Sequence, residues 1–284
     1  MNKKENFLRA KKQSPKGETK MKKIITIMLS ALMAIMACFS LTACAPKSDL
    51  ESVKNAGKLV VGVTIYEPMD YIDENGEWTG FDAELAKEFA ETLGVNCQIV
   101  IITWSQKVAE LDSRQIDLVW NGMTASDELG EKIDFSVSYA KNAQVAVVKN
   151  TSSISTKEQV AAAKIAVENG SAGHTVAKDD IKATSITPVT AQVDALTEVS
   201  AGTSDVAIID ITMAQSVVGK GEYANLKIVP NVSYGDEIFA VGLRKGSDLK
   251  AELDAFLKAK YASGELATLA QKYNVGLNTD ELSK

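Results

Sequence analysis

Residues 80–85 are Gly80-Phe81-Asp82-Ala83-Glu84-Leu85, and they begin the first helix of an alternating helix and strand pattern that predicts the fold class. The chain from Asp82 to Leu93 is predicted as an amphipathic helix because its apolar residues recur at helical spacing, at Leu85, Phe89 and Leu93. Asp82 can cap the start of this helix and Gly94 can end it. Short apolar runs precede and follow it, so the helix is expected to alternate with strands.

These apolar runs predict buried strands at residues 59–64, 116–120, 164–167 and 205–209. A second helix is expected where an apolar stripe recurs at Trp104, Val108 and Leu111. Strands that alternate with helices favour an α/β architecture with mostly parallel sheets. Cys97 lies in a further strand-like run, residues 95–101, and is expected to be a packed, unreactive thiol.

The N-terminal region has the order of a secretion signal. Lys22 and Lys23 precede an almost wholly apolar run, residues 24–40, which ends in Leu41-Thr42-Ala43-Cys44. That ending resembles the lipobox of bacterial lipoproteins, in which the leader is removed and the cysteine is acylated. The alternative is an ordinary signal peptide in which Cys44 has no role. Residues 1–44 are therefore assigned to a signal peptide and residues 45–49 to a tether. Because Met21 begins an adequate leader, translation is expected to start there and leave residues 1–20 untranslated; a long positive leader is the alternative.

The charge of the chain disfavours nucleic-acid binding, and its cysteine count excludes a disulfide-bonded fold. Residues 1–44 hold nine of the 31 basic and two of the 37 acidic residues, which leaves 22 basic against 35 acidic residues in the mature part. Such an acidic chain does not favour nucleic-acid binding, which needs clustered Lys and Arg. Only Cys97 remains beyond Cys44, so an internal disulfide is excluded. We expect a monomer without a cofactor.

Several motifs in order resemble the extracellular solute-binding proteins, family 3, which deliver polar amino acids to ABC transporters. The resemblance covers Gly57 to about Val275, and the motif at 80–85 is its most specific part. The other matching segments are residues 57–62, 66–69, 116–124, 133–136 and 244–247.

This resemblance implies two α/β lobes, two hinge strands and a ligand cleft between the lobes, the type II binding-protein fold. Lobe 1 is expected to be discontinuous, at about 50–145 plus 238–284, and lobe 2 to span 146–237. The hinges are expected near residues 144–147 and 238–241. Open α/β sheets bind ligands outside the carboxyl ends of their strands, which is where the cleft is expected.

The resemblance also implies ligand contacts at three places. Tyr66 and Trp104 match two aromatics that enclose the ligand side chain, with core packing as the alternative. Residues 121–124 follow a strand, and their backbone and a threonine hydroxyl are expected to bind the ligand amine and carboxylate, with a plain turn as the alternative. This segment comprises Asn121, Gly122, Met123 and Thr124.

Two further positions lie at strand ends of the second lobe. Asp210 matches the aspartate that pairs with the ligand α-ammonium; a helix N-cap is the alternative. The turn at residues 170–173 offers amide N–H groups and a hydroxyl to a carboxylate, through Ser171 and Ala172, unless it is a simple glycine turn. His174, the single histidine, is expected at the surface of the helix that follows.

Leu129 is the departure from the family pattern that matters most. Many relatives carry an arginine there that grips the ligand carboxylate, and Glu168 stands where some carry a lysine. Two explanations remain open. An α-amino acid carboxylate could be held by Ser171, Thr124, amides and a cation such as Lys107. Alternatively, the ligand lacks a free carboxylate or is itself cationic, and Asp210 with Glu168 selects it.

Sequence motifs for catalysis or metal binding are missing, since the chain has one histidine and no phosphate loop or nucleophile motif. The function expected is the substrate-binding subunit of an ABC importer, lipid-anchored outside the cell membrane, with a permease and an ATPase as partners. The alternatives are a ligand-binding sensor module and a cyclohexadienyl-dehydratase-like enzyme on the same fold.

Overall fold

The computed structural model describes residues 48–284, which form one compact unit. The predicted signal peptide with Cys44, including residues 1–20, lies outside the described residues. Of the predicted tether, only Ser48 and Asp49 are described. Ser48 caps helix α2 (Asp49–Ala56) through its hydroxyl, which accepts a hydrogen bond from the Glu51 amide. No helix within residues 48–284 is both long and apolar enough to cross a membrane.

The first lobe is built on a five-stranded sheet in the order β4-β1-β5-β12-β6. Strands β4 and β5 both pair in parallel with β1, and β12 runs antiparallel to its neighbours β5 and β6. The bounds of the strands are β1 (Lys58–Val63), β4 (Asn96–Ile101), β5 (Leu118–Val119), β6 (Asp134–Phe135) and β12 (Gly242–Leu243). Between β1 and β4, the chain forms a separate two-stranded antiparallel hairpin, β2 (Tyr71–Ile72) with β3 (Trp78–Thr79).

Six helices belong to the same part of the chain as the first sheet. Helix α3 packs against β1 and β4, and α10 packs against α11. Besides α2, their bounds are α3 (Phe81–Thr92), α4 (Lys107–Asp112), α5 (Asp127–Gly130), α10 (Leu249–Ala262) and α11 (Glu265–Tyr273), with a 3₁₀ turn, η1 (Trp104–Gln106), before α4.

The second lobe has its own five-stranded sheet, in the order β11-β7-β10-β8-β9. Strands β8, β9 and β10 are parallel, whereas β7 pairs antiparallel with β10 and β11. The strands are β7 (Ala140–Lys149), β8 (Lys164–Glu168), β9 (Ser185–Val189), β10 (Val206–Asp210) and β11 (Leu226–Phe239). The helical segments are α6 (Lys157–Ala161), α7 (Ala172–Thr175), η2 (Val176–Asp180), α8 (Gln192–Ala201), α9 (Ile211–Val217) and η3 (Gly221–Tyr223).

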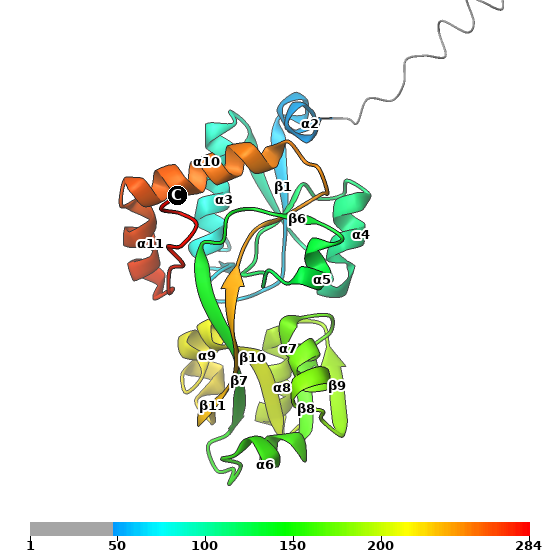
Figure 1. Ribbon diagram of the computed structural model, residues 1–284. Helices are drawn as coiled ribbons and strands as arrows, with labels where there is room; N and C mark the ends of the chain where they lie inside the picture. The colour runs from blue at the N-terminus through cyan, green and yellow to red at the C-terminus, as the bar shows by residue number, and fades with distance from the viewer. Residues whose placement is uncertain (1–47) are drawn as a thin grey trace, which may run out of the picture. The chain divides into compact units, whose positions relative to one another are not determined.

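Two long paired strands connect the lobes. The chain enters the second sheet along β7 and returns along β11, and Figure 1 shows these strands side by side between the lobes. Their pairing runs from Leu226 opposite Lys149 to Phe239 opposite Ala140, with register shifts on the way. The predicted hinge segments, 144–147 and 238–241, fall on β7 and at the end of β11. The predicted α/β fold with two lobes and two hinge strands is confirmed.

The helix predicted from Asp82 to Leu93 is present as α3, but its start differs from the expectation. Gly80 occupies the N-cap position at φ +120°, where a Cβ would lie 2.2 Å from the Met69 carbonyl oxygen. Asp82 therefore lies inside the first turn. Its carboxylate accepts hydrogen bonds from the Gly122 amide and the Tyr139 hydroxyl instead of capping the helix.

Other predicted elements are also present, with shorter bounds in places. The strand predicted at 116–120 is reduced to Leu118–Val119, and the helix with the Trp104 stripe is split into η1 and α4. Cys97 lies on β4 opposite Leu59 and packs against the core. Burial raises the pKa of its thiol to about 11, which fits an unreactive core residue.

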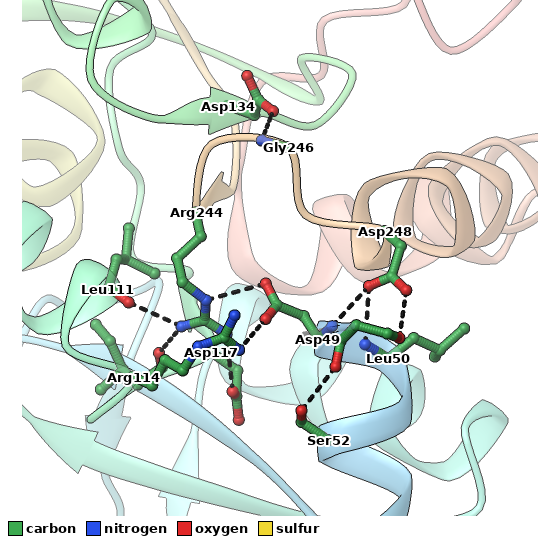
Figure 2. A network of polar contacts seen from close by, with 12 residues as sticks. Asp49, Leu50, Ser52, Leu111, Arg114, Asp117, Asp134, Arg244, Gly246 and Asp248 are labelled. Atoms are coloured by element: carbon green, nitrogen blue, oxygen red, sulfur yellow. Dashed lines mark hydrogen bonds and ion pairs between the residues drawn. The ribbon is translucent and has the colours of Figure 1, made fainter. Parts of the chain in front are cut away.

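A buried charge cluster holds the start of the folded chain to the C-terminal part of lobe 1. This cluster consists of Asp49, Arg114, Asp117 and Arg244, and Figure 2 shows how they converge. Arg244 Nε donates to Asp49 at 3.0 Å and Nη2 to Asp117 at 3.2 Å. Its Nη1 donates to two main-chain carbonyls, those of Leu111 and Ile116. Burial alone would raise the pKa of Asp49, but hydrogen bonds from Arg244 and its neighbours outweigh burial and lower the pKa.

Candidate functional site

A cavity of about 520 Å³ opens between residues of the two lobes. It contains every position that the sequence analysis assigned to the ligand, although these come from distant parts of the chain. Their binding roles stay predictions, but the structure brings all of them to one cavity: Tyr66, Trp104, Lys107, Asn121, Gly122, Met123, Thr124, Glu168, Ser171, Ala172 and Asp210.

The turn that follows β5 is fixed by hydrogen bonds to buried groups on the side away from the cavity. The Asn121 carboxamide accepts from the Thr64 amide and hydroxyl, and donates to the Thr64 carbonyl and to Asp70. The Gly122 amide donates to Asp82 at 2.6 Å. Gly122 has φ +54°, and a Cβ there would lie 2.8 Å from the Tyr66 ring, so the position requires glycine. The Asn121 side chain therefore positions the turn, and the main chain is the part left to meet a ligand.

Asp70 and Asp82 form a pair of fully buried carboxyl groups behind this turn. Each has one carboxyl oxygen without a hydrogen-bond partner. Burial raises the pKa of Asp82 to about 7. Burial and the charge of Asp82 raise the pKa of Asp70 well above its ordinary value. The pair therefore favours a protonated state at neutral pH.

Asp210 ends β10 and occupies the N-cap position of α9, but its side chain makes no capping bond. Its carboxylate is 4% exposed and accepts hydrogen bonds from three carboxamides, at 2.5 Å each, from Asn142, Gln144 and Gln192. The alternative of a helix N-cap therefore holds for the position of Asp210 but not for its side chain. Burial and the nearby Glu237 raise the pKa of Asp210 to about 7, and the carboxamides partly oppose this. The amides hold the carboxylate in place without neutralising its charge.

Glu237 is a cavity residue that sequence reasoning missed. It accepts hydrogen bonds from Asn142 and Gln144 at 2.7 and 3.0 Å and from the Thr124 hydroxyl at 2.9 Å. A hydroxyl has one hydrogen. Thr124 therefore cannot donate to a ligand carboxylate while it donates to Glu237.

Three carboxamides were also missed, although part of the signal is visible in the sequence. Asn142 and Gln144 alternate along β7, so they share one face of the strand, which is otherwise apolar with Ala140, Ala146 and Val148. A pair of carboxamides at that spacing in a buried strand indicates a polar site. Gln192 begins α8 and has no comparable pattern around it.

The turn after β8 contributes a hydroxyl to the cavity. Ser171 caps the short helix α7, because its Oγ accepts from the His174 amide at 3.1 Å. The hydroxyl hydrogen of Ser171 is not used in that bond and remains available. His174 does not line the cavity; it is half-buried and its Nδ1 accepts from the Gly170 amide. The expected surface position is therefore found only in part, because the side chain is half-buried, and the expectation that His174 does not contact the ligand stays a prediction.

Lys107 reaches across the cleft from the first lobe to the second. Its ammonium donates to the Gly170 carbonyl at 3.0 Å and to the Trp104 carbonyl at 3.3 Å, and lies 4.6 Å from the centroid of the Trp104 ring. Burial lowers the pKa of Lys107 to about 8, although the charge of Glu168 opposes this. Two of its three hydrogens are used, so one remains for a ligand.

Glu168 ends β8 and is 2% exposed, with one carboxyl oxygen that has no hydrogen-bond partner. Burial and the charge of Asp210 raise its pKa to about 8, while Lys107 lowers it. A buried, unpaired carboxyl group is unfavourable unless a partner arrives.

The two aromatics combine core packing with a place in the cavity. Tyr66 is almost fully buried, packs edge-on against Phe239, and has a hydroxyl without a hydrogen-bond partner. Trp104 is also buried and packs with the cluster that Leu129 joins. The alternative of core packing therefore holds for both residues at the same time as cavity lining.

The charges that line the cavity include no arginine at or near Leu129. Leu129 lines the cavity, and the lining residues include two lysines, Lys107 and Lys132, but no arginine. Within residues 48–284 there is no group of three or more His, Cys, Asp or Glu side chains that could hold a metal ion. The site is therefore an acidic pocket between two lobes, which is the architecture of a small-molecule binding protein.

Comparisons with known proteins define the family. The family of bacterial extracellular solute-binding proteins, family 3, matches residues 59–276, and the chain belongs to it. The chain is 29% identical over 246 residues to the L-cystine-binding protein TcyJ of Escherichia coli (strain K12), a match that covers 85% of this chain and 91% of TcyJ. The arginine-binding extracellular protein ArtP of Bacillus subtilis (strain 168) is 28% identical over 253 residues, covering 86% and 97%.

A solved structure shares the fold as well. The crystal structure of the ancestral amino acid-binding protein AncCDT-1, a precursor of cyclohexadienyl dehydratase, has a TM-score of 0.72 at 30% identity. The match covers 80% of this chain and 99% of that one.

Proposed function

We propose that this chain is the substrate-binding subunit of an ABC importer and captures an amino acid outside the cell membrane. Membership of the solute-binding family supports the proposal, as do relatives named for binding L-cystine and arginine. The single observation that carries it is the Asp210 carboxylate, buried in the cavity and held by three carboxamides that leave its charge uncompensated.

Asp210 is the group that binds the ligand α-ammonium. Moving an ammonium from water into a buried cavity is costly unless a charge partner receives it. The Asp210 carboxylate is fixed by Asn142, Gln144 and Gln192, so little side-chain entropy is lost when the ligand arrives. The main chain of residues 121–124 lies in the same cavity and supplies carbonyl acceptors to the same ammonium.

The ligand carboxylate faces Lys107 and Ser171. Lys107 has one free hydrogen and Ser171 has its hydroxyl hydrogen, and they belong to different lobes. This pair takes the place of the arginine that Leu129 replaces. Tyr66 and Trp104 enclose the remainder of the ligand.

Ligand binding closes the two lobes around the hinge strands. A ligand that contacts both lobes favours the state in which both contacts exist at once, by its differential affinity for that state. Two direct contacts across the cleft assist closure: Lys107 to the Gly170 carbonyl, and the Ser216 hydroxyl to Glu67 at 3.0 Å. We assign residues 50–145 plus 238–284 to the first lobe and 146–237 to the second.

Delivery requires partners in the membrane. We propose a permease and an ATPase as these partners, and a lipid on Cys44 as the anchor, with the chain acting as a monomer. Support for the anchor comes from the sequence alone, where a charged and then apolar leader ends in Leu41-Thr42-Ala43-Cys44.

A thermal-shift screen tests the proposal. The purified chain is stripped of carried-over ligand by unfolding and refolding, and is then screened against the twenty amino acids, L-cystine, amines and short peptides. A true ligand at 100 to 1,000 times its Kd adds roughly 3–4 kcal/mol of stability. The shift should disappear in Asp210→Ala and persist in Glu222→Gln, an exposed control. No shift with any amino acid would contradict the proposal.

The likeness to AncCDT-1, a precursor of an enzyme, makes turnover the second candidate. Steady-state assays of the same preparation with prephenate and arogenate decide between the two. Turnover would replace the importer proposal with a dehydratase.

A further inference from the structure

Glu168 is a buried carboxyl group in the cavity that the proposed amino-acid contacts do not use. It is 2% exposed, and one of its oxygens has no hydrogen-bond partner. Within residues 48–284 it forms no ion pair, although Lys107 lines the same cavity. A carboxyl group that is buried in a cavity wall, with one oxygen lacking a hydrogen-bond partner, is placed to receive a group from a ligand.

The charges around the cavity are not balanced. Among the lining residues, Glu128 and Lys132 neutralise each other at 2.9 Å at an exposed edge. The other charged lining residues are three carboxyl groups and one ammonium: Glu168, Asp210, Glu237 and Lys107. An amino-acid head brings one positive and one negative charge, so it leaves this excess of carboxyl groups unchanged.

Glu168 and Asp210 come from neighbouring strands. Strands β8 and β10 are parallel with Ala166 opposite Ala207, so their carboxyl ends reach the same edge of the sheet. Both side chains line the cavity, and the charge of Asp210 acts on Glu168. An α-ammonium bound at Asp210 therefore leaves Glu168 as a second anionic position a short way along the ligand.

We propose that Glu168 binds a second positively charged group of the ligand, in addition to the α-ammonium at Asp210. This inference rests on the proposed function and names its substrate class. The ligand is an amino acid with a cationic side chain, either an ammonium or a guanidinium, or a molecule with a second amino-acid head such as L-cystine. These sources share one chemistry, a second cationic nitrogen.

The protonation of Glu168 predicts the direction in which ligand affinity changes with pH. The groups that act on Glu168 are Asp210 on β10, Asp194 on α8, Lys107 on α4 and the Thr64 hydroxyl after β1. Burial, followed by Asp210, raises its pKa to about 8, so the empty site holds a proton at pH 7. A ligand cation favours the carboxylate, so binding releases that proton. The affinity for a cationic ligand, relative to that for a neutral amino acid, therefore rises with pH toward 8, because the loss of charge on Lys107 affects both ligands alike. A ligand that used Glu168 as a neutral donor would show the opposite trend.

Isothermal titration calorimetry on the purified full chain tests the proposal with matched ligands. L-Arginine and L-lysine carry a side-chain cation, and L-cystine carries a second amino-acid head. L-Citrulline and L-glutamine keep the amino-acid head but have neutral side chains. The variants are Glu168→Gln, which keeps the shape of the side chain, and Glu222→Gln, an exposed position in η3 of the second lobe.

We expect at least one ligand with a second cation to bind about 10- to 100-fold more tightly than the neutral pair, the range for one charge-assisted hydrogen bond. Glu168→Gln should remove most of this preference and leave the affinity for neutral ligands within threefold, whereas Glu222→Gln should change nothing. Arginine or lysine binding identifies the side-chain cation, and cystine binding identifies the second head.

Two outcomes would overturn the inference. If L-glutamine or L-citrulline bound as tightly as every cationic ligand, Glu168 would not select a cation, while the importer proposal would stand. If no amino acid bound at all, the proposed function would fail and the inference with it. If Glu168→Gln does not fold, the ratio of the affinities for cationic and neutral ligands in the unaltered chain still shows whether the site selects a second cation.

Discussion

Buried charge is organised in opposite ways in the charge cluster of lobe 1 and in the cavity between the lobes. In the cluster, Asp49 is 3% exposed and Arg244 is 6% exposed, and the arginine bonds two carboxylates and two carbonyls (Figure 2). In the cavity, Glu168 and Asp210 are equally buried but have no cation in ion-pair contact among residues 48–284.

The difference separates charges that are paired within the fold from carboxyl groups that we propose are paired by a ligand. The charges of the cluster are paired with one another, so the cluster contributes to the free energy of unfolding in the protein without a ligand. The cavity leaves its carboxyl groups with raised pKa values, and their partner has to come from outside. Buried charge alone therefore does not indicate a binding site; unpaired buried charge at a cavity wall does.

The largest expected effect comes from breaking the cluster. Arg244→Met should lower the free energy of unfolding by about 3–5 kcal/mol, because it leaves Asp49 and Asp117 without their main partner. Urea unfolding measures the change, and ligand affinity should be unaffected in the protein that remains folded. The control is Lys250→Met, which removes the more exposed pair with Asp254 and should cost below about 1 kcal/mol.

The pH dependence of the same variant provides a second check. The pKa of Asp49 is lowered in the folded state, so its contribution is present above 3.8 and is lost as the pH falls through the folded pKa. Arg244→Met should therefore lose less stability in acid than the unaltered chain does. Equal loss of stability in Arg244→Met and Lys250→Met would contradict the contrast between the two regions.

An intermediate effect is expected at Lys107, the one buried cation of the cavity. Lys107→Ala should weaken amino-acid binding at least tenfold, about 1.4 kcal/mol, because we propose that its remaining hydrogen binds the ligand carboxylate. Lys132→Ala is the matched control, since that ammonium already pairs with Glu128, and its effect should stay below threefold. Calorimetric titration measures both, and unchanged affinity in Lys107→Ala would remove this residue from the site.

The smallest expected effect concerns the carboxyl pair behind the cavity. Asp82 has a folded pKa of about 7, above its unfolded value of 3.8, so stability is lost as the pH rises from 3.8 through 7. Asp70→Asn keeps an acceptor for Asn121 and removes the repulsion, so it should stabilise the protein by about 1 kcal/mol at pH 8.

The exposed Asp112→Asn serves as the control for this variant and should change stability by less than about 0.5 kcal/mol. Denaturation curves at pH 5 and pH 8 give both values. If Asp70→Asn destabilised the protein equally at the two pH values, the carboxyl pair would have to be treated as a neutral hydrogen-bond network.

The sequence predicted the fold well because its signals are local. Helical spacing located α3, and apolar runs located β1, β8 and β10 near their observed bounds. The cavity residues at strand ends followed from the same reasoning together with the family resemblance. Asp82 was misplaced because a carboxyl group at a helix start is equally compatible with capping, and only the tertiary structure brings Gly122 and Tyr139 to it.

The residues that sequence reasoning missed depend on long-range pairing. Glu237 faces Asn142 because β11 pairs with β7 in that register, across 95 positions of the sequence. Periodicity along one segment carries no information about such a register. The carboxamides around Asp210 come from β7 and α8, and their convergence is likewise set by the sheet order.

The number of protons released when the ligand binds shows whether the buried carboxyl groups of the cavity receive a cation. Titrations at pH 7.5 in buffers of different ionisation enthalpy give this number. The raised pKa values of Glu168 and Asp210, about 8 and about 7, predict release of about one proton, and Glu168→Gln should remove most of it. Binding without proton release, or with proton uptake, would show that Glu168 and Asp210 do not bind a ligand cation as carboxylates. It would contradict the proposed role of the cavity.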